Sequence, residues 1–260
     1  MGTPRIQSVD RAFLLLTQVS AGATSLPTIA QRSGLSVATA HRLLSTLESL
    51  GVIVRADNAG YRIGMAVHEL AGRESPKQLL AIAAVPLLRR LVRMTGLTAH
   101  AGVLDDELMV DYVAREAPPR GYRVPTQQGS RLEAYCSGLG KVLLAAIPED
   151  ALEEYLASGP LIALTARTIV DPAALRAELA AVRARGHAID EREMFDDLRC
   201  VAVPICNGRG AVVAALSLSG NSDVLTTEQV AVVFPQLQEL AGQLAGKLFP
   251  SGAAIEGAWL

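Results

Sequence analysis

The sequence predicts an α+β protein with an N-terminal winged helix-turn-helix, a linker helix and a C-terminal α+β domain built on an antiparallel sheet. Three observations support this prediction. Residues 1–50 contain three short helical patterns, a basic hairpin follows them, and from residue 97 apolar and polar residues alternate in paired segments. We therefore expect a winged domain over 1–70, a linker helix over 71–85, a larger domain over 86–250 and a flexible tail over 251–260.

The first three helices are predicted from apolar spacing and from residues typical of helix ends. A helix over roughly 6–20 follows from four apolar residues at helical intervals, Ile6, Val9, Phe13 and Leu16. The stretch "LPTIAQRS" has Pro27 in its first turn and Gly34 after its end. The third helix has Ser36 as N-cap and Gly51 after its end. We expect one stripe of it to be buried: Val37, Ala40, Leu44 and Leu47.

The other face of the third helix predicts a contact with the major groove of DNA. Its residues are small or carry hydrogen-bonding groups, which lets a backbone approach base edges and phosphates: Ser36, Ala38, Thr39, His41, Arg42 and Ser45. The stretch "VIVRADNAGYRIG" then predicts a hairpin that places Arg55 and Arg62 near the adjacent DNA backbone or minor groove. The alternative is a small helical protein-interaction domain with an exposed polar face.

The charge distribution agrees with this assignment. Residues 1–70 hold six arginines and four acidic residues, a net charge of +2, within a chain whose total is -2. A mildly basic N-terminal segment in an otherwise acidic chain is compatible with a DNA contact made by a few arginines.

A helix starting at Ser75-Pro76 and running to Gly96 joins the two parts, with Pro86 expected to kink or divide it. We take 71–85 as the linker helix, the alternative being a surface helix of the second domain. Beyond it, hairpin strands are expected in "LTAHAGVL" and "ELMVDYVA", a further strand near 121–125, and strands in "HAID", "RCVAVPIC" and "AVVAALSLSG". Helices are expected from Ser137 and near 148–157, 171–185 and 226–248.

The stretch "EAYCSGLGKVLLAAI" raises the question of an anion site. It is no nucleotide-binding P-loop, because Lys141 is followed by Val142 and the first glycine of that motif is missing. Two interpretations remain. The backbone amides of Gly138, Leu139 and Gly140 at a helix N-terminus can hold a carboxylate, or the glycines simply let the helix pack closely on the sheet.

Six stretches in one order resemble the IclR (isocitrate-lyase-regulator) family of bacterial transcription factors. They are "IQSVDRAFLLL", "GLSVATAHRLLSTLESLGVI", "YRIGMAVHEL", "YCSGLGKVLLA", "RGHAIDEREMFDDLRCVAVPI" and "AALSLSG". The resemblance covers nearly the whole chain. It implies a GAF/PAS-like effector-binding domain, a linker helix that packs against its twin, and a homodimer or dimer of dimers on double-stranded DNA with a palindromic operator.

The resemblance also implies an effector site for a small organic acid. Its residues would be Cys136, Gly138, Leu139, Gly140, Asp190, Cys200, Ser217 and Ser219. Tyr135-Cys136 resembles the subgroup that responds to aromatic acids, whereas Asp197-Leu198-Arg199 departs from the glycine that the family usually has before its cysteine. The identity of the effector, the operator sequence and the choice between repressor and activator stay open.

Other kinds of protein are disfavoured. No apolar run is long enough to span a bilayer, and three cysteines without a C-x-x-C pair favour neither a disulfide framework nor a zinc site. We expect a cytoplasmic regulator with no catalytic residue, metal or cofactor. Two alternatives remain: a DNA-binding dimer without an effector, and a hydrolase in which Cys136 beside a helix N-terminus is an activated nucleophile.

Overall fold

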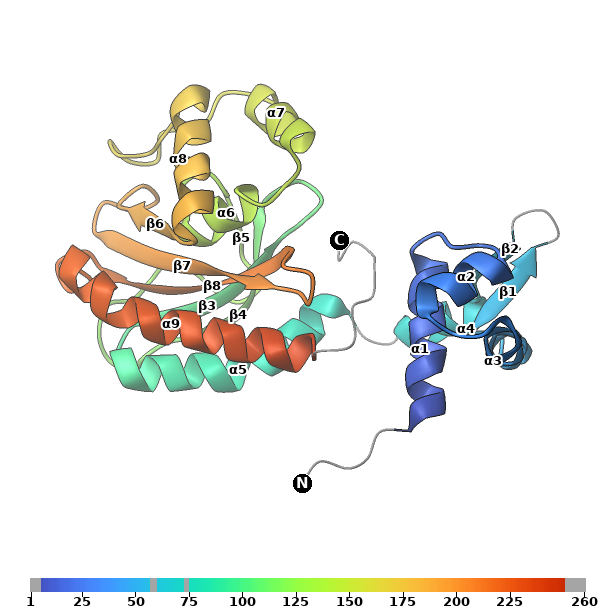
Figure 1. Ribbon diagram of the computed structural model, residues 1–260. Coiled ribbons are helices and arrows are strands. Elements are labelled where there is room, and N and C mark those ends of the chain that lie inside the picture. Colours follow the sequence, from blue (N-terminus) through green and yellow to red (C-terminus); the bar gives the residue numbers. More distant parts are fainter. Residues whose placement is uncertain (1–5, 57–59, 73–74, 251–260) are drawn as a thin grey trace. The chain divides into compact units, whose positions relative to one another are not determined.

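The computed structural model describes residues 6–56, 60–72 and 75–250 (Figure 1). The chain divides into two compact units, one ending at Ser75 and one beginning at Pro76. The predicted α+β class is confirmed, since a helical unit with a hairpin precedes a unit of mixed helices and strands. The predicted tail over 251–260 and most of the hairpin turn, residues 57–59, lie outside the described residues.

The first unit has the element order of a winged helix-turn-helix, and helix-end signals in the sequence explain most of its boundaries. Its elements are α1 (Gln7–Ser20), α2 (Leu26–Ser33), α3 (Val37–Ser49), β1 (Ile53–Ala56), β2 (Gly60–Ile63) and α4 (Met65–Ala71). The Ser25 and Ser36 hydroxyls cap α2 and α3 by accepting from the amides of Thr28 and Thr39. Gly34 ends α2 in the left-handed region, at φ 67°.

The core of the first unit confirms three of the four residues expected along the buried stripe of α3. Ala40, Leu44 and Leu47 pack with Leu15 and Ile29 from the first two helices. Val37 is the exception, because its side chain is 53% exposed. It is the first residue of α3, and the packed core begins one turn further along, at Ala40.

The second unit is a six-stranded antiparallel sheet in the order β5-β4-β3-β8-β7-β6, covered by helices on both faces. Its strands are β3 (Thr98–Leu104), β4 (Val110–Glu116), β5 (Arg131–Leu132), β6 (Ala188–Glu191), β7 (Leu198–Cys206) and β8 (Val212–Asn221). Its helices are α5 (Pro76–Thr95), α6 (Gly138–Leu144), α7 (Glu149–Ala157), α8 (Pro172–Arg185) and α9 (Thr227–Leu248). Figure 1 shows α5 and α9 on one face, and α6 with α7 and α8 on the other.

Each face of the sheet has its own apolar core. Leu88 and Leu91 of α5 and Leu237 of α9 pack against one face, and α6 and α8 pack against the other with Leu139 and Leu179. Beside the second core lies a group of buried polar side chains that includes His100, Asp190, Ser217 and Ser219. Among the described residues, no helix combines the length and the apolar character needed to cross a lipid bilayer.

The predicted linker helix over 71–85 is corrected by the structure. Residue 71 ends α4, residues 73–74 lie outside the described part, and α5 continues without a break from Pro76 through Pro86 to Thr95. The helix persists because Leu80 and Ala84 before the proline and Leu87 after it are buried against the same sheet. The missing proline N–H removes a single backbone bond, which this burial outweighs. Residues 76–85 therefore belong to the second unit.

The strand expected near 121–125 is also absent from the described structure. That segment is irregular, and the short β5 pairs with the outer edge of β4 instead, through Val110 opposite Leu132. Gly121 has a φ of 125°, and Pro125 has no N–H to offer to a neighbouring strand.

Candidate DNA-binding face and effector site

The face of α3 that the sequence assigns to DNA is open to solvent. Ser36, Ala38, His41, Arg42 and Ser45 are exposed and Thr39 is partly buried. Two of these groups also serve the helix itself, since the Ser36 hydroxyl accepts from the Thr39 amide at 3.2 Å and lies 2.9 Å from the Thr39 hydroxyl. Within the described part of the chain, no side-chain hydrogen bond holds His41 or Arg42. These two side chains are thus free to reach an external partner.

The two arginines of the hairpin point in opposite directions. Arg55 stands opposite Tyr61 and Val54 stands opposite Arg62, and side chains alternate along a strand, so the two arginines occupy opposite faces. The Arg55 guanidinium lies 5.8 Å from the centre of the Tyr61 ring, a cation–π contact. Both arginines are exposed. The hairpin therefore presents its two arginines on opposite faces, which the sequence alone did not indicate.

The predicted effector residues on the sheet form part of one buried polar strip. Asp190 on β6 stands opposite Cys200 on β7, Cys200 stands opposite Ser219 on β8, and Ser219 stands opposite Thr98 on β3. Because directly opposed residues share a face, these four side chains form a row beneath α6. One step along the strands, Ala202, Ser217 and His100 make a second row. The sheet thus brings Asp190, Cys200, Ser217 and Ser219 together, as predicted.

The glycines at the start of α6 are explained by close packing. A Cβ on Gly138 would stand 2.8 Å from the Cys200 sulfur, and a Cβ on Gly140 would overlap the Ala134 backbone. The Gly140 amide already donates to the Ser137 hydroxyl at 3.1 Å, which caps the helix. The Leu139 side chain is buried in the apolar core. Of the two interpretations left by the sequence, the structure supports close packing of helix on sheet.

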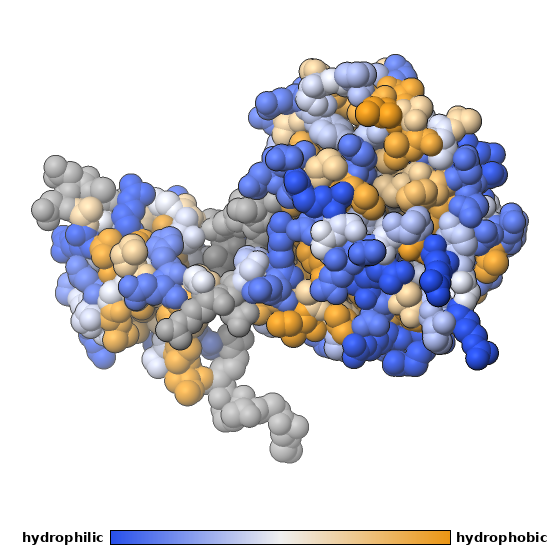
Figure 2. Space-filling model, turned by 180° about the vertical axis from the view of Figure 1, so that it is seen from behind, coloured by the Kyte–Doolittle hydropathy of each residue, from blue (hydrophilic) through white to orange (hydrophobic). Residues whose placement is uncertain are grey.

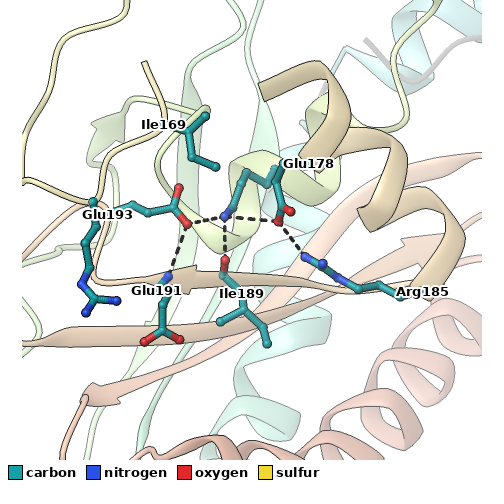
Figure 3. A pocket seen from close by; sticks show the side chains of 8 residues that line it. Ile169, Glu178, Arg185, Ile189, Glu191 and Glu193 are labelled. Carbon is teal, nitrogen blue, oxygen red and sulfur yellow. Dashed lines mark hydrogen bonds and ion pairs between the residues drawn. The ribbon is translucent and has the colours of Figure 1, made fainter. Parts of the chain in front are cut away.

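Lys141, which follows these glycines, is an internal ion-pair partner. It is 1% exposed, donates to the Ile189 carbonyl at 2.6 Å and bonds the Glu193 carboxylate, with Glu178 at 3.5 Å. Figure 3 shows Glu178, with Arg185 beside it, and Glu193 at the wall of a hollow of about 500 Å³. The described lining of this hollow is Lys141, Arg167, Ile169, Glu178, Arg185, Ile189, Glu191 and Glu193.

This hollow is separate from the predicted effector residues, none of which is in its described lining. Three cations and three anions face it, so the lining is close to neutral. It adjoins the polar strip through Glu193, whose amide donates to the Asp190 carboxylate at 2.7 Å. Lys141 and Glu193 are charged side chains that are almost completely buried. In the sequence the only sign of this pair was a single lysine within an apolar run.

Burial controls the ionisation of the strip. It raises the pKa of Asp190 to about 7, against the effect of hydrogen bonds from the Glu193 and Met194 amides. It lowers the pKa of His100 to about 3, with a further contribution from the positive charge of Arg115. The His100 ring therefore stays neutral, and Asp190 is close to half protonated at neutral pH.

The same effect removes the basis for a cysteine nucleophile. Burial raises the pKa of Cys136 to about 12, and the nearby carboxylates of Asp190 and Glu193 reinforce it. Burial also raises the pKa of Cys200 to about 12, although it hydrogen-bonds Ser219 and Ser217. An activated thiol requires a lowered pKa, so these surroundings disfavour nucleophilic chemistry. Among the described residues, no group of three or more His, Cys, Asp or Glu is arranged to hold a metal ion.

Five residues of the strip were missed in the sequence. His100 Nε2 lies 2.8 Å from the Thr126 hydroxyl, and its ring meets Tyr112 edge-on with 5.3 Å between ring centres. The Tyr112 hydroxyl bonds Ser137. The remaining two members are Thr98 and Arg115. A signal existed in "LTAHAGVL", where polar Thr98 and His100 alternate with Ala99 and Ala101, which face the opposite core.

The fold defines a class of protein: a winged-helix regulator whose second domain carries a strip of buried polar side chains. Comparison with known proteins agrees. The IclR helix-turn-helix domain matches residues 8–57, and the family described as bacterial transcriptional regulator IclR C-terminal matches residues 76–245. The chain belongs to the IclR family of transcriptional regulators.

Individual relatives match over most of their length. The chain is 35% identical to the HTH-type transcriptional regulator XynR of Escherichia coli, with 91% of this chain and 94% of the relative covered. It is 32% identical to BhcR of Paracoccus denitrificans, with 96% and 90% covered. These relatives are DNA-binding regulators rather than enzymes, in agreement with the prediction.

Solved structures show the same fold. IclR of Thermotoga maritima superposes with a TM-score of 0.62 at 28% identity, with 94% of this chain and 99% of that chain covered. An IclR homologue from Microbacterium hydrocarbonoxydans, complexed with 4-hydroxybenzoate, gives a TM-score of 0.62 at 27% identity, with 93% and 98% covered.

Proposed function

We propose that this regulator binds a palindromic operator as a homodimer or a dimer of dimers in the cytoplasm, and that a small organic acid in the buried strip changes its affinity for DNA. No metal or other cofactor takes part. The observation that carries the proposal is the pairing of an exposed, donor-bearing α3 face with a polar strip sealed inside the second unit. An effector changes DNA affinity only if it binds two conformations of the protein unequally, and couplings of about 1–3 kcal/mol are usual.

The composition of the strip supports a hydroxylated or oxo acid as the effector. Hydroxyls, a thiol and a carboxyl with a pKa of about 7 offer both donors and acceptors in a dry site. The apolar residues Leu139 and Val142 of α6 pack with Ala202 and Ala215 in the core on the same face of the sheet. The 4-hydroxybenzoate bound by the Microbacterium homologue belongs to this chemical class, which makes it a suitable first probe.

Exposed apolar side chains at the start of α1 and just before it support self-association. Ile6, Val9 and Phe13 recur at helical spacing and are 68%, 49% and 59% exposed. Figure 2 shows orange apolar areas among polar ones on the surface of both units. One small winged domain makes few base contacts, whereas two domains on a palindrome roughly square its discrimination.

Arg42→Ala tests the DNA contact. The purified protein first selects its preferred duplex from a random-sequence pool, and fluorescence anisotropy then measures its affinity over a range of salt concentrations. We expect weaker binding and a slope of log K against log salt smaller by about 0.9, the value for one lost phosphate contact. Glu48→Ala, on the last turn of the same helix, is the matched control. Unchanged affinity and slope in Arg42→Ala would remove this residue from the interface.

Ser219→Ala tests the effector site. Titration calorimetry first measures how the wild-type protein binds a panel of hydroxy and oxo acids, from lactate to 4-hydroxybenzoate. Operator affinity is then measured with and without each acid that binds. The variant should bind the operator normally but respond less to the acid. If no acid binds while operator binding is intact, the alternative of a DNA-binding dimer without an effector is supported instead.

A further inference from the structure

Two buried polar atoms on the β3–β4 side of the strip have no hydrogen-bond partner within the described part of the chain. They are the Thr98 hydroxyl oxygen and the Arg115 Nε. Thr98 is 1% exposed. A buried donor or acceptor left unpaired costs about 1–3 kcal/mol, so protein interiors rarely retain one without a reason. Both atoms lie next to the site already assigned to a small molecule, and a ligand would supply the missing partners.

The sheet register places these two residues on the same face as the predicted effector residues. Thr98 stands opposite Ser219, and Arg115 stands opposite His100, two residues further along β3. The Arg115 Nη2 donates weakly to the Val124 carbonyl at 3.4 Å, which leaves the Nε–H directed elsewhere. The guanidinium is near enough to His100 to lower the pKa of that imidazole.

The charges along the strip differ from end to end. At the β3–β4 end the His100 ring is neutral, because burial lowers its pKa, and it lies between the hydroxyls of Thr126 and Ser217. The positive charge there is that of Arg115. At the other end are the carboxyls of Asp190 and Glu193. Lys141 is the cation nearest to them, and it is already bonded to Glu193 and Ile189. The carboxylate of a ligand is repelled by the carboxyls of Asp190 and Glu193 and attracted by the guanidinium of Arg115.

We propose that Arg115 and Thr98 bind the carboxylate of the effector, so that the acid group lies at the β3–β4 side and the hydroxyl or oxo group points toward Cys200 and Asp190. This inference rests on the proposed function, and it reverses the orientation in which the N-terminus of α6 would hold the acid. It explains why the Nε of Arg115 is buried without an acceptor among the described residues.

The dimensions select a class of ligand. Three inter-strand steps separate the strand of Cys200 from that of Arg115, about 14 Å between backbones, and both side chains shorten this span. A compact acid with its polar substituent at the far end of the molecule, such as a ring-hydroxylated aromatic acid, bridges the two ends. An acid whose hydroxyl is next to its carboxylate reaches only one of them. The site therefore favours the first kind over the second.

Pairs of an acid and its amide test the assignment, because an amide keeps the shape and removes the charge. Calorimetry on the full-length protein compares 4-hydroxybenzoate with 4-hydroxybenzamide, and likewise every other acid of the panel that binds. We expect the wild-type protein to prefer the acid, and Arg115→Met to bind the acid roughly 10- to 100-fold more weakly and to lose that preference. Arg131→Met, on the exposed strand β5, makes the same change of charge outside the strip and should behave as wild type.

Thr98→Val separates the effect on ligand binding from the effect on stability, because the variant should bind the acid more weakly without becoming less stable. Removing an unpaired buried hydroxyl should leave the ligand-free melting temperature unchanged or raise it, whereas acid affinity should fall roughly 5- to 10-fold. Thr95→Val on α5 is the control, since its hydroxyl bonds the Leu91 carbonyl outside the site. That change should lower the melting temperature without changing acid affinity.

The outcomes separate this inference from the proposed function. If acids bind and Ser219→Ala weakens them, but Arg115→Met retains the preference for acid over amide, the orientation is wrong and the proposed function stands. If none of the acids binds to the wild-type protein, both are overturned. Loss of the acid preference in Arg115→Met, with unchanged amide binding and unchanged operator affinity, supports the inference and excludes misfolding.

Discussion

Replacing Asp190 with asparagine tests the electrostatics of the strip directly. Burial raises the pKa of this carboxyl from 3.8 to about 7 in the folded protein. A shift of about 3 units corresponds to about 4 kcal/mol between the protonated and ionised forms. Because the folded-state pKa is the higher one, the protonated carboxyl stabilises the fold fully below about pH 4, and this contribution is lost as the pH rises toward 7. Asparagine keeps the shape of the protonated group and does not titrate.

The expected result is a difference that depends on pH. Between about pH 5 and pH 8 the wild-type protein should lose about 3 kcal/mol of stability relative to the Asp190→Asn variant. Urea unfolding of both full-length proteins at several pH values measures this difference in the free energy of unfolding. Hydrogen exchange of the β7 and β8 amides is the readout, because these amides report on the second unit alone. Parallel stability curves for the two proteins would refute the claim that burial raises the pKa of Asp190.

Asp105→Asn is a control with the opposite sign. Burial tends to raise the pKa of Asp105, but hydrogen bonds from the Met109 amide, Arg131 and the Glu107 amide together lower it. A carboxyl with a lowered pKa contributes stability that is present above its unfolded pKa and is lost as the pH falls. The wild-type protein should therefore lose stability relative to this variant toward acid pH, in contrast to Asp190.

Two further predictions concern packing and thiol reactivity. Gly140→Ala should destabilise the second unit by about 3 kcal/mol or more, because the added methyl overlaps the Ala134 backbone. Gly242→Ala, at an open position inside α9, should instead stabilise it by about 0.5–1 kcal/mol in thermal unfolding. Labelling the native protein with a thiol reagent at neutral pH should modify the half-buried Cys206 first, with Cys200 modified only after unfolding; rapid labelling of Cys200 would contradict its burial and raised pKa.

Much of the first unit was predictable from the sequence. The Ser36 cap, the Gly34 and Gly51 helix ends and the exposed face around Arg42 all follow from interactions within a few residues along the chain. Such local signals act before any tertiary contact forms, so one sequence suffices to recognise them. The prediction that Val37 is buried was wrong. Apolar spacing identifies one face of a helix, but it does not show how far along the helix that face is covered by its neighbours.

The order of elements in the second unit was also largely predictable, with two exceptions. Alternation and turn residues indicated β3, β4, β6, β7 and β8, and caps indicated α6 and α8. The extent of α5 was misjudged at Pro86, because burial on both sides of the proline outweighs a single missing hydrogen bond. The strand expected near residue 123 was lost to Pro125 and to the left-handed Gly121.

The sequence by itself determined the helix ends, the exposed recognition face and four residues of the strip, the last through a resemblance to a family. Only the tertiary structure decided that His100 meets Ser217, 117 residues away, that Lys141 pairs with Glu193 rather than with an external anion, and that Arg115 faces the strip. The physical reason is that strand register and burial fix these contacts. Both depend on the whole sheet, whereas caps and turns depend on neighbouring residues.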